Sequence, residues 1–541
     1  MCGICGIANG SGRSLDKAAL HRLNTAIAHR GPDGEGYYEH NGIGLGMRRL
    51  AIIDVAGSDQ PIFNEDESVA IVFNGEIYSY QHLRAGLIQR GHQLRTNGDT
   101  ECIVHLYEEE GPGCLRHLRG MFALALWDEA RQRLLLARDR LGKKPIFYTV
   151  QDGKLYWAAE LKPLLSVLPS EPEIDLAAID QYLSLQYIPE PYTAYKGVYK
   201  LPAASYAIWE RGELHIERYW DLNFEPKYAA SEAALSDELR ELAAESVRLR
   251  LISEVPLGAH LSGGIDSSIV VALMAEASSG PVKTFSVGFE ESQFSELPLA
   301  RQVAERYGTE HHEFMLTFGD IPATLDTLLQ HFGEPFADPS ALPLYHLSRL
   351  TREHVTVALN GDGGDESFAG YPRYWLDPLA DTYLHLPKAV TRTMVPALAD
   401  VLTDAGDRPV GRGLTNGIKR LPQLTDVDAR ASLLRWSSYF TVAQKQALWQ
   451  PSVAAGLNLR QAEQDMAAIY AAAPARTRLD RTLYTDIKTY LPGALLVKAD
   501  RMTMAIALEG RSPFLDHVLV EWAARLPVRY KLRGRQGKYL L

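Results

Sequence analysis

The N-terminal residues contain a cysteine whose position suits nucleophilic chemistry. Cys2 directly follows the initiator Met1 and is small enough for that methionine to be removed. Removal would leave a thiol beside a free α-amine, whose pKa of about 7.7–8.0 lets it act as the general base. The alternative is that Cys2 and Cys5 form a redox pair or half of a zinc site. Cys102 and Cys114 are too widely spaced to form a second C-x-x-C pair, so no zinc site is completed.

A glycine-rich loop is the second feature that suits chemistry. Residues 261–268 read Leu-Ser-Gly-Gly-Ile-Asp-Ser-Ser and lie between a predicted strand and a predicted helix. Glycines let backbone N–H groups approach an anion, and the helix N-terminus adds a favourable dipole. The loop has neither the Walker A pattern nor the dinucleotide pattern G-x-G-x-x-G. The alternative is a simple glycine turn in which Ser or Asp caps the helix.

An acidic loop strengthens the anion-binding interpretation. Residues 361–366 read Gly-Asp-Gly-Gly-Asp-Glu and follow a strand predicted at 355–360. Open parallel sheets bind their ligands beyond the ends of their strands, so we expect both loops at one site. Asp266 and Asp365 are then suited to share Mg²⁺, which prefers carboxylate and phosphate oxygens. A calcium loop is a weaker alternative because the EF-hand ligand spacing is absent.

The elements that must position the cysteine are short strands separated by Gly and Asn. Alternating apolar residues predict strands at 44–54, 68–78, 121–128 and 133–138. Helical patterns interrupt these strands at 17–28 and 80–90. We therefore predict an α+β domain in which layered antiparallel sheets lie between helices.

The elements that must position the two loops alternate between strand and helix. After a long amphipathic helix at 229–251, the sequence predicts buried strands at 256–261, 282–289 and 355–360, with helices at 267–277 and 297–307. This alternation predicts an α/β domain with a parallel sheet covered on both faces. Residues 382–498 are predicted to add extra helices. We place the boundary near Tyr219, so that the two domains cover residues 2–218 and 219–541.

Composition and charge limit the classes of function. The 541 residues include 56 Lys and Arg against 67 Asp and Glu, a net charge of −11. An acidic chain of this kind is a poor general binder of nucleic acids or anionic membranes. No apolar run approaches the ~18 residues that cross a bilayer, and the N-terminus shows no signal region, so we expect a cytoplasmic protein. We interpret the basic residues near the C-terminus as solvated surface rather than an RNA patch, namely Arg525, Arg529, Lys531, Arg533, Arg535 and Lys538.

Four motifs in the N-terminal half occur together in a known order. They are His-Arg-Gly-Pro-Asp at 29–33, Arg-Leu-Ala-Ile-Ile-Asp at 49–54, Asn-Gly-Glu-Ile-Tyr at 74–78 and Asp-Thr-Glu at 99–101. Residues 2 to about 165 thereby resemble a class II glutamine amidotransferase domain, whose fold is of the N-terminal-nucleophile hydrolase type.

This resemblance implies a role for each motif. Cys2 would attack the side-chain amide of glutamine, while the Asn74 side chain and the Gly75 N–H hold the oxyanion, because donors are needed where charge develops. Arg provides a planar fork that matches a carboxylate. Glutamine would therefore be bound by Arg49 on its carboxylate, by Glu76 and Asp99 on its ammonium, and by Ile53 in the pocket.

Residues 235–541 resemble the synthetase domain of the asparagine synthetase family, a group of ATP pyrophosphatases with a Ser-Gly-Gly-x-Asp-Ser loop. Further matching motifs lie at 286–289, 338–340 and 511–516. Asp362 would face the reacting intermediate, and Lys498 and Arg501 would lie near the phosphates or the adenylated carboxylate. The resemblance implies that ATP is bound by Leu261, Ser262, Gly263, Gly264, Asp266, Ser267, Val287 and Gly363.

Together the two resemblances predict a two-step enzyme that uses ATP and Mg²⁺. Glutamine is hydrolysed to glutamate and ammonia, a carboxylate is adenylated, and ammonia displaces AMP to form an amide. Aspartate is the default acceptor, and the alternative is a larger acceptor in surface-polysaccharide or protein-sorting pathways. A cyclase or a non-catalytic binding protein is disfavoured because Cys2, Asn74 and Asp99 are all present. The resemblance is compatible with a homodimer, and because relatives usually continue further we expect a chain truncated at Leu541.

Overall fold

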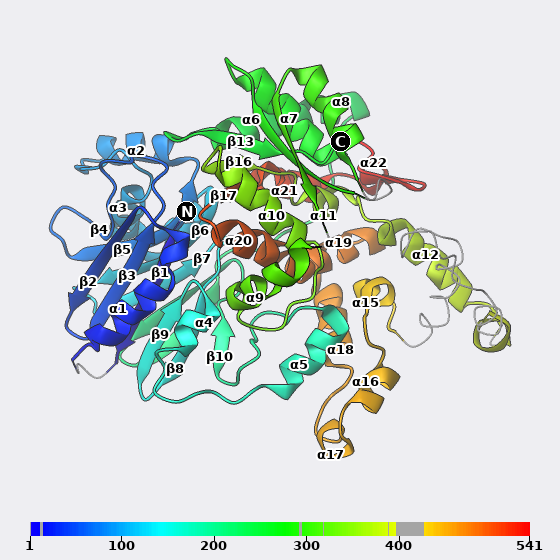
Figure 1. Ribbon diagram of the computed structural model, residues 1–541, viewed down its shortest axis with the longest axis horizontal. Helices are drawn as coiled ribbons and strands as arrows, with labels where there is room; N and C mark the ends of the chain where they lie inside the picture. Colours follow the sequence, from blue (N-terminus) through cyan, green and yellow to red (C-terminus); the bar gives the residue numbers. More distant parts are fainter. Residues whose placement is uncertain (1, 11–13, 291–294, 318, 388, 396–426) are drawn as a thin grey trace.

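The computed structural model describes residues 2–10, 14–290, 295–317, 319–387, 389–395 and 427–541. Layered sheets of the N-terminal half lie beside a mostly helical C-terminal half that surrounds its own sheet (Figure 1). Within the described segments, every helix is too short or too polar to cross a membrane.

Two six-stranded antiparallel sheets form the N-terminal part. The first has the order β10-β8-β9-β1-β3-β2 and consists of β1 (Gly3–Asn9), β2 (Gly34–His40), β3 (Ile43–Arg49), β8 (Phe147–Gln151), β9 (Lys154–Ala158) and β10 (Val198–Lys200). The second has the order β12-β11-β7-β6-β5-β4 and consists of β4 (Ile62–Phe63), β5 (Val69–Ile77), β6 (Gly120–Asp128), β7 (Arg133–Arg138), β11 (Ser205–Glu210) and β12 (Glu213–Arg218).

The sheets pack face to face because alternate strand residues are apolar. Ile4, Met47, Val72 and Ala125 are among the buried residues that fill the space between them. Helix α1 (Lys17–Ala26) covers the outer face of the first sheet, and α2 (Tyr80–Gln89) and α3 (Glu101–Glu110) cover the second. The predicted α+β domain of layered antiparallel sheets between helices is confirmed.

A five-stranded parallel sheet forms the centre of the C-terminal part. Its order is β15-β14-β13-β16-β17, with β13 (Leu257–His260), β14 (Lys283–Phe289), β15 (Glu310–Leu316), β16 (Val357–Leu359) and β17 (Glu509–Arg511). One face is covered by α6 (Glu232–Arg250), α7 (Ile265–Ala277), α8 (Leu297–Tyr307) and α21 (His517–Arg525), and the other by α10 (Ala341–Arg352). The predicted α/β domain is confirmed.

Extra helices surround this sheet, as predicted for residues 382–498, although 396–426 lie outside the described residues. They are α9 (Asp320–Phe332), α11 (Gly364–Phe368), α12 (Arg373–Leu384), α15 (Ser432–Ser437), α16 (Val442–Leu448), α17 (Pro451–Ala454), α18 (Gln461–Ala472), α19 (Arg478–Lys488), α20 (Leu496–Met504) and α22 (Val528–Lys531). In the N-terminal half, α4 (Leu161–Leu165) and α5 (Leu176–Leu185) complete the helices.

Four elements differ from the sequence-based expectation. The strand predicted at 44–54 ends at Arg49, because the residues that follow turn toward the C-terminal domain. Helix α3 was not predicted, since Glu101–Tyr107 are all buried and include the polar residues Glu101 and His105, which a sequence pattern assigns to an exposed face. Strands β15 and β17 were missed as well, because β15 is largely polar and β17 has only three residues.

Candidate functional site

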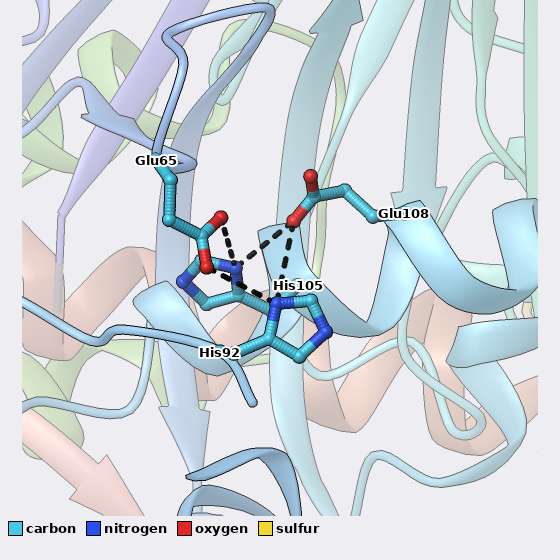
Figure 2. A group of neighbouring side chains, drawn as sticks. All are labelled: Glu65, His92, His105 and Glu108. Carbon is cyan, nitrogen blue, oxygen red and sulfur yellow. Dashed lines mark hydrogen bonds and ion pairs between the residues drawn. The ribbon is translucent and has the colours of Figure 1, made fainter. Parts of the chain in front are cut away.

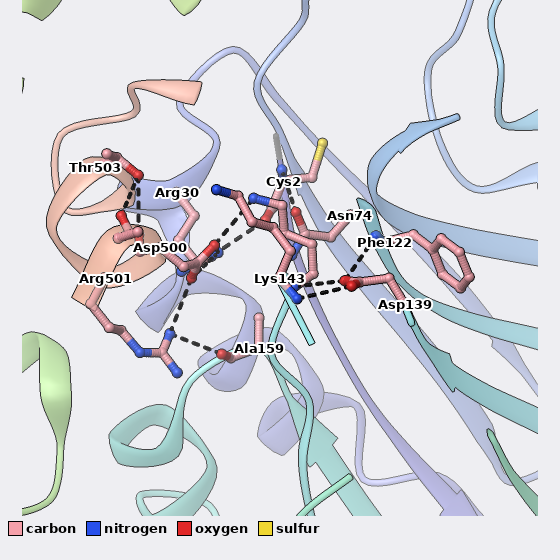
Figure 3. A network of polar contacts seen from close by, with 12 residues as sticks. Cys2, Arg30, Asn74, Phe122, Asp139, Lys143, Ala159, Asp500, Arg501 and Thr503 are labelled. Atoms are coloured by element: carbon pink, nitrogen blue, oxygen red, sulfur yellow. Dashed lines mark hydrogen bonds and ion pairs between the residues drawn. The ribbon is translucent and has the colours of Figure 1, made fainter. Parts of the chain in front are cut away.

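Cys2 lies in a buried pocket at the start of β1. Its side chain faces the core between the two sheets and is 6% exposed. The Cys2 backbone N–H donates to Asn74 Oδ1 on β5 at 3.0 Å (Figure 3). Asn74 Nδ2 is buried and has no hydrogen-bond partner among the described residues. A free donor beside a thiol is the arrangement that a tetrahedral oxyanion needs.

Burial raises the pKa of the Cys2 thiol above its usual value, although the nearby Arg49 guanidinium opposes this effect. A neutral thiol requires a base before it can attack, which agrees with a nucleophile that has its own α-amine. Cys5 lies three residues along the strand and faces α1 instead, where its Sγ is 3.8 Å from Asn24 Oδ1. Because Cys2 and Cys5 face opposite sides of β1, the C-x-x-C alternative is excluded.

Gly75 lies opposite Phe122 where β5 pairs with β6. A Cβ atom at this position would lie 2.1 Å from Met121 O, so the strands approach too closely for any other residue. The close pairing therefore keeps the backbone after Asn74 in place.

The expected glutamine-binding residues surround this pocket. Arg49 Nη1 donates to Val55 O at 2.8 Å and to Asp59 Oδ1 at 2.7 Å, so the loop after β3 holds the guanidinium. Ile53, in the same loop, packs between the cores of the two domains. Glu254 of the C-terminal domain accepts hydrogen bonds from the backbone of this loop at 2.8 and 3.1 Å.

Two buried acids lie at the other end of the pocket. Asp99 Oδ2 accepts from the Ile77 N–H at 2.7 Å, and burial raises the pKa of Asp99 to about 6. Burial, together with the nearby Glu509 carboxylate, raises the pKa of Glu76 well above its usual value. Glu76 Oε2 has no hydrogen-bond partner in the described chain. Both groups are thus suited to receive a positively charged substrate group.

The glycine-rich loop in the C-terminal domain holds its own shape. Ser262 Oγ and Ser267 Oγ lie 3.0 Å apart, and the Gly264 N–H donates to Ser262 Oγ at 3.2 Å. Gly263 has φ +77, a conformation that other residues rarely adopt. Leu261 and Val287 lie at the ends of β13 and β14, which border this loop.

The acidic loop touches the glycine-rich loop directly. A Cβ atom on Gly364 would lie 2.6 Å from Asp266 Cγ, so this close approach requires glycine. Gly363 has φ +97 and begins α11. The two loops that the sequence placed at one site are therefore adjacent.

Lys538 joins the two acidic loops. Its Nζ lies 2.5 Å from Asp266 Oδ2 and 2.7 Å from Asp365 Oδ1, so one cation contacts both carboxylates. Asp266 Oδ1 is buried without a hydrogen-bond partner among the described residues. The two carboxylates share one cation, and Asp266 Oδ1 makes no hydrogen bond in the described chain. These oxygens fit the donor set that Mg²⁺ prefers.

The interpretation of Lys538 as solvated surface is wrong. Its side chain is only 13% exposed. The cause is the hairpin of β18 (Leu532–Arg533) and β19 (Gln536–Gly537), which returns the chain to α11. There the Lys538 N–H donates to Phe368 O at 2.8 Å. Lys531 is also buried, with its Nζ 3.1 Å from Asp480 Oδ1. No sequence pattern distinguished these two lysines from their exposed neighbours.

Asp362 lies next to a lysine from the N-terminal domain that sequence reasoning missed. Asp362 Oδ2 has no hydrogen-bond partner in the described residues and lies 3.9 Å from Lys143 Nζ. Lys143 donates to Ser512 Oγ at 2.5 Å, and burial lowers the pKa of Lys143 to about 8. Lys498 is bound to Asp338 and Ser340 at 2.7 and 2.6 Å.

Arg501 contacts the N-terminal domain. Its Nη1 donates to Ala159 O at 3.0 Å and lies 3.3 Å from Glu160 Oε1, both in the N-terminal domain (Figure 3). The buried Glu160 carboxylate attracts the guanidinium across the interface. Arg501 therefore connects the two domains.

A buried arginine extends this connection to the cysteine. Arg30 Nε donates to Cys2 O at 3.3 Å, and its Nη1 donates to Glu160 Oε1 at 2.9 Å. Its Nη2 contacts both carboxylate oxygens of Asp500 on α20 at 2.9 and 3.1 Å (Figure 3). One side chain thus links the backbone of Cys2 to the helix that carries Lys498.

A small cavity of about 20 Å³, enough for about one water molecule, lies between the two domains. Phe147 from the N-terminal domain and Leu496 and Val497 from α20 contribute apolar walls, while Lys143 and Arg501 contribute charged ones. The domain interface is therefore not packed solid beside the arginine network.

Comparisons with known proteins agree with this arrangement. Residues 1–220 match a family model described as a glutamine amidotransferase domain, and residues 238–541 match one described as asparagine synthase. The chain is 36% identical to a protein named asparagine synthetase [glutamine-hydrolyzing] 1 from Bacillus subtilis, over 100% of this chain and 83% of that protein. A second relative, named amidase chry2, from Gibberella zeae, is 30% identical over 98% of this chain and 84% of its own length. Among solved structures, a glutamine phosphoribosylpyrophosphate amidotransferase from B. subtilis is 13% identical, covers 70% of this chain and 77% of its own, and gives a TM-score of 0.31.

Proposed function

Because the chain belongs to the asparagine synthase family, with a glutamine amidotransferase domain at its N-terminus, we propose that it makes an amide from a carboxylate at the expense of glutamine and ATP. The observation that carries this proposal is the pairing of two sites in one chain. A buried cysteine with an oxyanion donor is joined through Arg30 to Asp500 of the C-terminal domain, and the same domain holds two carboxylates that share a cation.

In the first step, the Cys2 thiol gives its proton to the α-amine, and its sulfur attacks the side-chain carbonyl carbon of glutamine. Asn74 Nδ2 and the Gly75 N–H stabilise the developing oxyanion. The C–N bond then breaks and the leaving nitrogen takes up the proton, so that ammonia leaves and a thioester remains. Water hydrolyses the thioester to glutamate. Arg49, Glu76 and Asp99 hold the α-carboxylate and the α-ammonium of the substrate.

In the second step, the acceptor carboxylate attacks the α-phosphate of ATP, which gives an acyl-adenylate and pyrophosphate. Residues 262–267 hold the pyrophosphate with backbone N–H groups and hydroxyls. Asp266 and Asp365 would hold Mg²⁺, which neutralises phosphate charge when bound. Ammonia then attacks the acyl carbon and AMP leaves. Asp362, whose Oδ2 is free of hydrogen bonds in the described structure, is the group we place beside this intermediate.

We propose aspartate as the acceptor, which makes the product asparagine. The name of the Bacillus subtilis relative supports this choice. The name of the Gibberella zeae relative favours the alternative, in which the same two sites act on a different acceptor.

Separate assays of the two steps test the proposal. The Cys2→Ala variant should lose synthesis with glutamine and keep synthesis with added ammonia, because only the first step needs the thiol. ATP–pyrophosphate exchange, measured over a panel of carboxylic acids, identifies the acceptor. Loss of ammonia-dependent synthesis in Cys2→Ala would contradict the assignment of the two steps to separate sites. Exchange with larger acids but not with aspartate would show that aspartate is not the acceptor.

A further inference from the structure

Two histidines and two glutamates gather in the amidotransferase domain, on the side of α3 away from Cys2. They are Glu65 in the turn after β4, His92 after α2, and His105 and Glu108 on α3, and we refer to them as the Glu65 cluster (Figure 2). One ligand atom from each residue lies within 4.8 Å of all the others. Three separate chain segments therefore direct metal-binding atoms toward one point.

The spacing of these atoms fits a tetrahedral ion. His105 Nδ1 lies 2.9 Å from Glu108 and 3.3 Å from Glu65. His92 Nδ1 lies 3.2 Å from Glu65 and 3.9 Å from Glu108. Ligands of tetrahedral zinc, with bonds of about 2.0–2.2 Å, lie about 3.3–3.6 Å apart. These four distances, two of which run to different oxygens of Glu65, bracket this value, and the remaining pairs lie within 4.8 Å, so modest side-chain movements bring the four groups to tetrahedral spacing.

Outer hydrogen bonds orient three of the four ligands. His92 Nε2 lies 3.1 Å from Glu109 Oε1, which leaves Nδ1 free to bind a metal. Asn64 Nδ2 donates to the second oxygen of Glu108 at 2.8 Å, and the Gln93 N–H donates to Glu65 Oε1 at 3.0 Å. Histidine ligands of metals almost always bond a carboxylate, carbonyl or water through their other nitrogen.

The charge of the cluster also favours a cation. Two carboxylates face two imidazoles, so the group presents negative charge and neutral nitrogen ligands to one point. A second group, His29, Glu160 and His331, differs in this respect. There Glu160 is already bonded to Arg30 and Arg501, whose fixed positive charges repel a metal ion.

We propose that the Glu65 cluster binds Zn²⁺ as a structural site. Histidine and carboxylate ligands at four-coordinate spacing suit zinc better than magnesium, which requires oxygen ligands in an octahedron. The ion ties the turn after β4 and the segment after α2 to α3. Helix α3 begins two residues after Asp99, so the site braces one wall of the glutamine pocket. This inference does not depend on the acceptor or on the adenylation step.

Metal titration of the full chain tests the site. The protein is stripped with a chelator, then titrated with Zn²⁺ by calorimetry and with Co²⁺ by visible absorption, in excess Mg²⁺ to saturate Asp266 and Asp365. We expect one Zn²⁺ per chain and a Co²⁺ spectrum of tetrahedral type without sulfur ligation. His92→Ala and Glu108→Gln, both at partly exposed positions, should weaken Zn²⁺ binding at least about 100-fold, and Glu109→Gln about 10–100-fold.

The control is His117→Ala, which removes a half-exposed histidine that pairs with Glu110 outside the cluster and should leave Zn²⁺ affinity unchanged. Zn²⁺ should also raise the unfolding temperature of the unmodified chain and of His117→Ala, but not of His92→Ala. Absence of stoichiometric binding would reduce the Glu65 cluster to a network of ion pairs. Binding that survives both His92→Ala and Glu108→Gln would place the ion elsewhere and overturn the proposal.

Discussion

The Asp500→Asn substitution removes the charge at the centre of the domain interface. Asp500 is buried and accepts from Arg30 at 2.9 and 3.1 Å, and its Oδ1 lies 3.4 Å from Lys144 Nζ. Within the described chain, Asp500 is the only carboxylate within 4.0 Å of the Lys144 ammonium. Asparagine keeps the shape and one acceptor oxygen, but it takes away the nearest counter-charge of the buried Lys144 and leaves only the more distant carboxylates of Glu509 and Asp139.

Removing one partner of a buried ion pair costs about 3–5 kcal/mol, because the remaining charge is left uncompensated. Arg30 retains Glu160 at 2.9 Å, so we expect a loss near the lower end, about 3 kcal/mol of unfolding free energy. Arg30 also donates a hydrogen bond to the Cys2 carbonyl. Greater mobility of Arg30 should therefore disturb the coupling between glutamine hydrolysis and amide synthesis.

The assay compares amide formed with glutamate released. With glutamine as donor, Asp500→Asn should release more glutamate for each amide than the unmodified chain does. With added ammonia, amide synthesis should be largely retained. Urea unfolding measures the stability change, and Asp326→Asn, at an exposed position on α9, is the matched control. Unchanged stability together with an unchanged ratio of glutamate to amide would refute the role of this network.

Three further predictions concern the two sites. Asn74→Ala should lower the glutaminase kcat about 10²–10³-fold, or about 2.7–4 kcal/mol, because it removes the oxyanion donor together with the acceptor of the Cys2 N–H, while Cys2 itself stays open to alkylation by a small reagent. The kcat/KM for glutamine should fall below about pH 6, since Asp99, with its pKa raised to about 6, then takes up a proton and no longer attracts the substrate ammonium; a profile that stays flat to pH 5 would contradict this. Lys538→Met should raise the Mg²⁺ affinity of the nucleotide-free protein several-fold, because Asp266 and Asp365 lose their shared cation, and unchanged Mg²⁺ binding in calorimetry would argue against a common position.

Much of the fold follows from local patterns. The alternating apolar residues of β5 and β6 are paired over nine positions, and both strands were predicted within one residue of their ends. The same holds for β7, whose alternating apolar run was predicted with both ends as observed. Helix α3 escaped prediction because Glu101–Tyr107 are all buried, so the polar residues Glu101 and His105 do not mark an exposed face as such predictions assume.

The sequence by itself determined the chemistry that each loop can perform. The features that carry this chemistry are local: a cysteine at position 2, an Asn-Gly pair and two loops rich in glycine and acidic residues. Their chemistry depends on the backbone conformation of a few neighbouring residues. The tertiary structure alone decided which charges meet. Lys538 reaches Asp266 across 272 positions, and Arg30 reaches Asp500 across 470. A buried charge requires a partner, but the sequence does not specify which group will lie near it. The partner is therefore decided by how the sheets and domains pack.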